Sequence, residues 1–175
     1  PLATALSASR LETLARCPYR YFLRYVLQIA PLDEPEDDPS VWLQPLHVGG
    51  LLHDLFCSFM RRLRNLGEDP QEDRHTDLMA DMLRDEVEQL RESFPPPNDA
   101  AYRADLQRLG RAAQLFLASE ADQSERERLG FEVSFGFGEK GGLNLPDPVV
   151  LPFAGGQSIL LRGRIDRVDR TRDGL

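Results

Sequence analysis

The sequence predicts an α+β fold, in which a helical N-terminal half precedes a β-rich C-terminal half. Apolar residues recur at three- and four-residue spacing as far as Leu117, which is the spacing of helices that bury one face. From Phe131 onward the period is two, the spacing of strands with one buried face. We therefore expect a single domain with a helical part over residues 1–125 packed on a mostly antiparallel β part over residues 130–175.

The first helical region is predicted to contain a break. Ser9–Glu12 has the spacing of a capping box, so a helix should begin near Ser7 to Ser9. Pro18 disfavours the α conformation at Cys17 but suits the first turn of a new helix, so we expect a restart there and an aromatic helix over 19–27. Further helices are expected over about 47–65, over about 76–93, and from a cap at Asn98 or Asp99.

Loops and strands account for the rest of the chain. Residues 30–45 combine prolines with an acidic run, which indicates a loop. Strands are expected over 131–137, 149–151 and 158–169, separated by turns that contain paired glycines. Gly163 lies inside the last of these strands, where glycine indicates a bulge or a close backbone approach.

Composition narrows the classes of protein that this chain can be. Acidic residues outnumber lysine and arginine by 29 to 21, for a net charge of -8, which excludes a basic protein that coats nucleic acid but not a nuclease. No apolar run approaches the length of a membrane span, and the start lacks the pattern of a signal peptide. Two cysteines favour a reducing compartment, so we expect a cytoplasmic protein. Because the chain begins without Met, we also expect it to be a piece of a larger protein.

Four features place chemically capable side chains along the chain. They are Cys17–Pro18 between helices, Gly49–His53 at the start of a helix, Glu132 on a strand, and Gly163–Arg167 on another strand. Each of them alone also fits a structural role. The cysteine fits a small buried side chain, the histidine a packing residue, Glu132 a solvent-facing position, and Asp166 a surface ion pair with its arginine neighbours.

In their order along the chain, these features resemble the RecB/AddB-type nucleases of the PD-(D/E)XK superfamily. The resemblance rests on residues 6–23, on Gly49–His53 as that family's Gly-x-x-x-His motif, on Glu132 with Phe135, and on residues 161–169, and it covers nearly the whole chain from Ser7 onward. It implies a restriction-endonuclease-like fold with a truncated sheet. It also implies metal-dependent hydrolysis of DNA phosphodiester bonds, as in an exonuclease of DNA repair or recombination.

The resemblance also implies the residues of the site. Asp166 and His53 would bind Mg²⁺ or Mn²⁺, and Glu132 would join them as a catalytic residue. Carboxylate oxygens suit these hard cations, and an imidazole ligand is tolerated best with Mn²⁺. Arg164 and Arg167 are phosphate-binding candidates, or else they neutralise neighbouring carboxylates.

Two departures from the family pattern qualify this interpretation. In the family, an acid-x-Lys pair follows the Gly-Arg-Ile-Asp-Arg strand, whereas the single lysine of this sequence, Lys140, precedes Asp166. We therefore expect this fragment to be inactive alone. Some family members also hold a 4Fe-4S cluster through one early cysteine and three late ones. Cys17 matches the early cysteine, its partners would lie outside this chain, and Cys57 is interpreted as a core residue.

Three hypotheses about function follow. The chain is part of a larger helicase–nuclease or nuclease that acts on DNA, or it is a degenerate nuclease fold that serves as a non-catalytic DNA-binding or subunit-interaction module. The third is a helical interaction domain that binds no nucleic acid. The expected partners are DNA and a helicase domain or subunit, without a membrane. Exposed strand edges would favour a dimer of the fragment.

Overall fold

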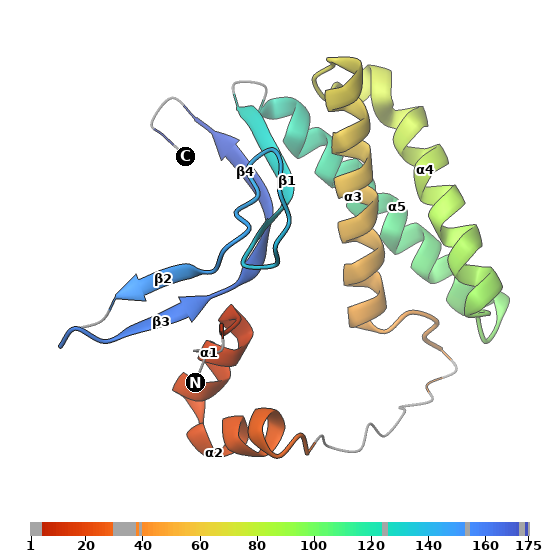
Figure 1. Cartoon of the computed structure of the whole chain (residues 1–175). Helices are drawn as coiled ribbons and strands as arrows, with labels where there is room; N and C mark the ends of the chain where they lie inside the picture. The colour runs from red at the N-terminus through yellow and green to blue at the C-terminus, as the bar shows by residue number, and fades with distance from the viewer. Residues whose placement is uncertain are drawn as a thin grey trace. The chain divides into compact units, whose positions relative to one another are not determined.

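The fold is α+β, as the sequence predicts. The computed structural model describes residues 5–29, 38, 40–123, 126–152, 155–171 and 174 (Figure 1). Contacts between residues divide the chain into two compact units. Residues 36–127 form one of them, here called the helical unit, and residues 1–35 together with 128–175 form the other, the strand unit. The single domain with a helical part over 1–125 stays a prediction. Most of the predicted acidic loop lies outside the described residues.

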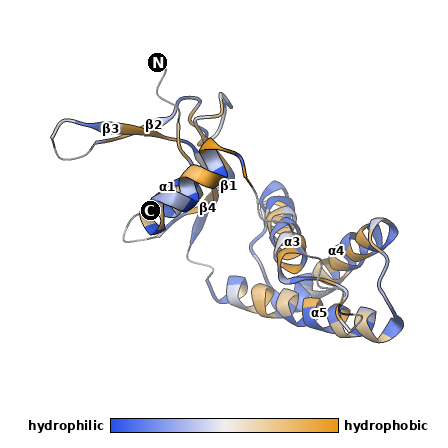
Figure 2. Cartoon of the chain, turned by 90° about the horizontal axis from the view of Figure 1, so that it is seen from below, coloured by the Kyte–Doolittle hydropathy of each residue, from blue (hydrophilic) through white to orange (hydrophobic). Residues whose placement is uncertain are grey.

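The helical unit consists of three long helices that pack against one another. These are α3 (Pro45–Leu66), α4 (Glu72–Ser93) and α5 (Asp99–Asp122). Figure 2 shows hydrophobic and hydrophilic stretches alternating along them, as expected for helices that bury one face. Their buried apolar side chains include Leu51, Leu55, Phe59, Met60 and Leu63 of α3, Met79, Leu83 and Val87 of α4, and Leu109, Ala113 and Leu117 of α5.

The segment before α3 is held by polar contacts to the end of α4 and to α5. The indole nitrogen of Trp42 donates a hydrogen bond to the carbonyl of Phe94 at 2.8 Å. The backbone N–H of Leu43 donates to the buried Asp105 carboxylate at 2.8 Å, and Arg108 donates to the Leu43 carbonyl at 3.1 Å. Since Trp42 and Leu43 are also fully buried, they fix where α3 begins.

A buried histidine orders the start of α4. The N–H of Gln71 donates to Nδ1 of His75, so Nδ1 carries the lone pair and the proton resides on Nε2. Nε2 then donates to the Glu68 carboxylate at 3.0 Å. This hydrogen bond, with a contribution from Arg74, holds the pKa of Glu68 below its ordinary value. The histidine therefore has a structural role in the helical unit.

The strand unit begins with a broken helix, as predicted. The helix α1 (Ala8–Arg16) is followed by α2 (Pro18–Tyr21) and by a π-helical turn, η1 (Phe22–Val26). Cys17 separates the first two in an extended conformation, and its sulfur caps α2 by accepting a hydrogen bond from the N–H of Arg20 at 3.4 Å. The predicted capping box does not form, because Ser7 caps α1 and the carboxylate of Glu12 pairs with Arg16 instead.

Two pairs of strands complete this unit. The strand β1 (Glu127–Phe135) pairs with β4 (Gly163–Arg170), and β2 (Val149–Pro152) pairs antiparallel with β3 (Ser158–Leu161). The prediction of one continuous strand over 158–169 is wrong, because Arg162 separates β3 from β4. There its N–H donates to the carbonyl of Leu6 at 3.0 Å, while the N–H of Leu6 donates to the carbonyl of Leu160 at 2.8 Å. Residues just before α1 are thereby joined to the start of β4.

Two glycines allow the strands to approach closely. A Cβ at Gly163 would lie 3.0 Å from the ring of Phe135, so the group that approaches closely at this position is a side chain and not the predicted backbone. Gly136 has a φ of +78°, and a Cβ there would lie 2.6 Å from Cβ of Arg162. Gly136 is therefore required both by its left-handed backbone and by its neighbour.

We predict that Gly136→Ala destabilises the protein more than Gly138→Ala does. Both residues have φ near +80°, but a Cβ at Gly138 meets nothing within 4 Å. Gly138→Ala should therefore cost only the left-handed backbone strain of about 1–2 kcal/mol. Gly136→Ala should cost about 1–3 kcal/mol more, because Arg162 must move. Urea unfolding of the two variants measures the difference, and equal losses would contradict the close approach.

Candidate metal centre

Two carboxylates from neighbouring strands meet in the strand unit. Glu132 lies on β1 and Asp166 lies on β4, and the two strands pair directly. One oxygen atom of each carboxylate lies within 4.8 Å of the other. Two carboxylates at this separation repel each other unless a cation or a proton lies with them. The pairing of β1 with β4 therefore places two acidic side chains where a cation could lie between them.

The backbone at Glu132 is in a conformation that side chains rarely adopt. Its φ is +53°, in the left-handed region, although it is not a glycine. The regular alternation of β1 also breaks here, since Val133 and Ser134 are both buried although they are adjacent. An interruption of this kind redirects a side chain relative to the rest of its strand. Strained non-glycine residues of this sort concentrate at functional sites.

The chemistry of this pair fits a divalent cation. Carboxylate oxygens are the preferred ligands of Mg²⁺ and Mn²⁺, and two carboxylates on adjacent strands supply two such ligands. Asp166 is exposed and Glu132 is half-buried, so a cation between them would keep access to water and to a substrate. Glu132 and Asp166 are thus the residues of the strand unit that could hold the metal.

His53, the third predicted site residue, lies on α3 in the helical unit. Its side chain is 40% exposed, so it is not one of the core residues of the three-helix unit. Its Nδ1 lies 3.2 Å from a carboxylate oxygen of Asp54. When Nδ1 carries the proton shared in this contact, Nε2 carries the lone pair that a metal ligand needs.

Arg164 is held in the strand unit by a bridging carboxylate. It donates to one oxygen of Glu139 at 2.9 Å, and the fully buried hydroxyl of Ser134 donates to the other oxygen at 2.8 Å. The guanidinium group also lies 5.8 Å from the centre of the Phe137 ring. These contacts give Arg164 a fixed position, and its role in binding phosphate stays a prediction.

Arg167 forms a two-point ion pair within its own strand. Its Nε and one terminal nitrogen contact the two carboxylate oxygens of Asp169 at 2.7 and 2.6 Å. Both side chains are mostly buried, which strengthens a charged pair of this geometry. Arg167 therefore neutralises the neighbouring carboxylate of Asp169, which was one of the two predicted roles. The other role, binding of phosphate, stays a prediction.

The cysteines do not form a cluster site by themselves. A 4Fe-4S cluster needs four cysteine thiolates, and this sequence has two. Cys17 lies in the strand unit as the cap of α2, whereas Cys57 is half-buried on α3 in the helical unit. The prediction that Cys17 contributes one ligand together with cysteines outside this chain stays a prediction.

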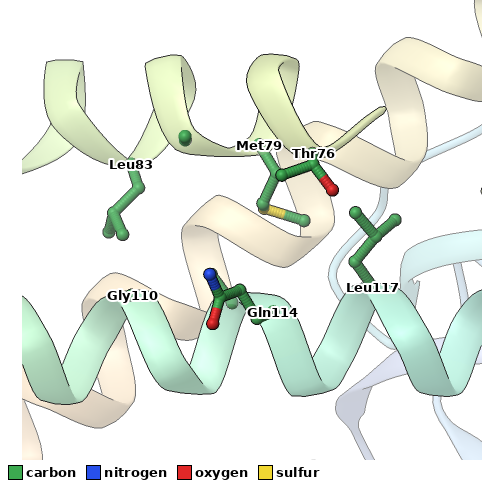
Figure 3. A pocket seen from close by; sticks show the side chains of 8 residues that line it. Thr76, Met79, Leu83, Gly110, Gln114 and Leu117 are labelled. Carbon is green, nitrogen blue, oxygen red and sulfur yellow. The ribbon is translucent and has the colours of Figure 1, made fainter. Parts of the chain in front are cut away.

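The helical unit also contains an apolar groove between α4 and α5 (Figure 3). Met79 of α4 and Leu117 of α5 line one end of it, and Leu83 lies opposite Gly110 at the other end. Gly110 leaves space there that a side chain would fill. Thr76 and Gln114 are the polar residues that line it. Its lining contains no charged residue, so it does not offer a metal or phosphate site.

Comparison with known families identifies the chain. The family model described as the PD-(D/E)XK nuclease superfamily matches residues 5–175. The chain belongs to the PD-(D/E)XK nuclease superfamily. The resemblance found in the sequence is thereby confirmed, and with it the α+β restriction-endonuclease-like fold. No helix in the described part of the chain has the length and apolar character that crossing a membrane requires.

Similar proteins are named as one subunit of an ATP-dependent helicase/deoxyribonuclease. The protein from Alkaliphilus metalliredigens is 28% identical over 177 residues, which cover 95% of this chain and 14% of that protein. The protein from Desulfitobacterium hafniense (strain DSM 10664 / DCB-2) is 33% identical over 166 residues, covering 93% of this chain and 13% of that protein. The protein from Acetivibrio thermocellus is 30% identical over 178 residues, which cover 96% of this chain and 14% of that protein. The chain therefore spans about one seventh of the length of these relatives.

Sequence reasoning missed the residues that support the site. Neither the Ser134–Glu139–Arg164 bridge nor the positive φ of Glu132 was predicted. The bridge joins residues up to 30 positions apart whose types are common on any surface, so no pattern marked it.

We predict that Glu132→Gly gives a more stable protein than Glu132→Ala. In an ordinary strand, glycine is less stable than alanine by roughly 0.5–1 kcal/mol. At a φ of +53° the glycine variant should instead have the higher free energy of unfolding, by about 1 kcal/mol, because only the alanine variant keeps the left-handed strain. Urea unfolding compares the two variants, and Ile165→Gly against Ile165→Ala on β4 provides the control with the ordinary order. A more stable alanine variant at position 132 would contradict the strained backbone.

Proposed function

We propose that this chain supplies the metal-binding part of a deoxyribonuclease of RecB/AddB type, which hydrolyses DNA phosphodiester bonds in repair or recombination. The observation that carries the proposal is the pair of carboxylates on β1 and β4, with oxygens within 4.8 Å, in a chain of the PD-(D/E)XK superfamily. The names of the relatives support a DNA substrate and a helicase partner.

Each site residue has a distinct proposed role. Asp166 and Glu132 hold a divalent cation, Mg²⁺ or Mn²⁺, and His53 of α3 joins them as a third ligand. When bound, the cation would supply a Lewis acid at the phosphate and increase the acidity of a nearby water. The residues of the chain fix its position: the paired strands hold the two carboxylates, and Asp54 orients the imidazole of His53.

The chain by itself is proposed to be inactive. Catalysis in the family requires a lysine paired with an acid on a strand, and Lys140 lies outside the strands, in the connection between β1 and β2. It also precedes Asp166 in the chain instead of following it. We therefore expect the lysine to come from the rest of the full-length protein. Retained DNA binding without cleavage in that protein would favour the alternative of a non-catalytic DNA-binding or subunit-interaction module.

We predict that the full-length protein cleaves DNA with Mn²⁺ and that three substitutions abolish this activity. Asp166→Ala, Glu132→Gln and His53→Ala should each lower the rate on the order of 100-fold or more, since losing even a partner of a metal ligand costs about 10- to 100-fold. Release of labelled nucleotides from single- and double-stranded DNA measures the rate.

The matched control for this experiment is His47→Ala. His47 is an exposed histidine on the same helix as His53, so the substitution removes an imidazole from α3 outside the proposed site. It should leave the cleavage rate unchanged. Cleavage that survives Asp166→Ala, or that falls equally in the His47 variant, would show that the site is assigned to the wrong residues.

A further inference from the structure

The net negative charge of this protein belongs to one of its two units. The helical unit, residues 36–127, carries twenty Asp and Glu against ten Arg, a formal net charge of -10. The strand unit, residues 1–35 and 128–175, carries nine Asp and Glu against eleven Lys and Arg, a net charge of +2. The unit that holds the carboxylate pair is therefore the one with the slightly positive net charge, which disfavours phosphate less than the acidic helical unit does.

Within the strand unit, the positive charge is concentrated in the residues of α1, α2 and η1, Ala8–Val26, here called the arginine–aromatic segment. It contains four arginines and a single acid, Glu12, for a net charge of +3. Glu12 pairs with Arg16 at 2.9 Å, which leaves the positive charge of the other three arginines uncompensated within the segment. Four aromatic residues alternate with these arginines.

The arginine–aromatic segment does not contribute to the core. None of the residues of α1, α2 or η1 is buried. The side chains of Tyr19, Phe22 and Val26 are 69%, 45% and 58% exposed. This contrasts with α3, whose apolar stripe is buried. Packing among the described residues therefore does not explain why this segment is rich in aromatic side chains.

The segment is nevertheless ordered by contacts among its own arginine and aromatic side chains. The guanidinium groups of Arg10 and Arg24 lie 4.9 and 5.6 Å from the centre of the Tyr25 ring. The rings of Tyr21 and Tyr25 lie 5.2 Å apart. Short π-helical turns such as η1 occur frequently at functional sites. These contacts hold charged and aromatic groups side by side at the surface.

We propose that the arginine–aromatic segment binds single-stranded DNA, with Arg20 and Arg24 at the phosphates and the rings of Tyr19 and Phe22 stacked on bases. Alternating cationic and aromatic side chains bind single strands in this way, because the charge follows the backbone and each base offers a face to a ring. An exposed ring favours a single strand over a duplex, whose bases already stack on one another.

The segment is connected to the carboxylate pair through the backbone. Leu6, one residue before the cap of α1, bonds to Leu160 of β3 and to Arg162, the residue directly before β4, which is the strand that carries Asp166. A DNA strand bound by the arginine–aromatic segment is therefore bound by the same unit that carries the two carboxylates. The choice of DNA as the nucleic acid rests on the proposed function, whereas the binding surface rests on the charge and exposure of the segment.

Fluorescence polarisation of labelled (dT)20 tests the proposal with the full chain in EDTA. The double variant Arg20→Gln/Arg24→Gln should weaken binding on the order of tenfold. It should also reduce the slope of log K against log salt by about 1.4, which is about 0.7 for each lost phosphate contact on a single strand. The matched control is Arg84→Gln/Arg91→Gln, which removes two exposed arginines from α4 in the acidic unit and should change neither quantity.

A second pair of variants tests the stacking. Tyr19→Ala should weaken binding of (dT)20 roughly tenfold, whereas Tyr19→Phe, which keeps the ring, should bind like the wild type. Neither variant should bind duplex DNA differently from the wild type. Equal losses in both Tyr19 variants, or a fall in unfolding temperature that accompanies the loss, would overturn the proposal in favour of a surface that packs on protein.

The experiment separates this inference from the proposed nuclease function. Binding is measured without divalent metal, so it does not depend on cleavage. Arginine variants that bind like the wild type and keep the salt slope would overturn the inference and leave metal-dependent cleavage intact. A full-length protein that binds through the segment but never cleaves with Mn²⁺ would overturn the proposed function alone.

Discussion

The pairing of β1 with β4 is the interaction on which the candidate site depends. Each strand contributes one carboxylate, and only their pairing brings an oxygen of Glu132 within 4.8 Å of an oxygen of Asp166. The approach is possible because Gly163 leaves room for the ring of Phe135 and Gly136 leaves room for Arg162. The left-handed backbone of Glu132 costs of order 1–3 kcal/mol, which the surrounding strand contacts must offset. A cation bound between the two carboxylates would reduce the repulsion between them.

The charge of the chain acquires a different meaning once it is divided between the units. The net charge of -8 is the sum of -10 on the helical unit and +2 on the strand unit. The net charge of the whole chain was the ground for excluding a basic protein that coats nucleic acid, whereas the strand unit by itself is slightly basic. The single lysine is equally informative, because it leaves arginine as the carrier of nearly all positive charge.

Much of the fold follows from local sequence rules. Where the structure differs from the elements that the sequence predicts, long-range contacts are the cause. Periodicity predicted α3, α4 and the strand β2 closely, and the proline rule predicted the break at Cys17. Periodicity failed to predict the end of β3 at Leu161. The apolar alternation continues past Arg162, but the N–H of Arg162 bonds to Leu6 and the strand is interrupted there. Of the site, the sequence order predicted Asp166 and Glu132, but the φ of Glu132 depends on strand pairing that no local pattern encodes. His53 alone also fitted a packing residue, and the structure shows that its side chain is partly exposed.

The most direct test of the account is the position of a bound cation. Crystals of the protein soaked in Mn²⁺ should show one strong anomalous peak between the carboxylates of Glu132 and Asp166, with the imidazole of His53 within bonding distance of it. The paired strands and the chemistry of the donors predict this result. A peak among the acidic residues of α4, with none at the carboxylate pair, would contradict it.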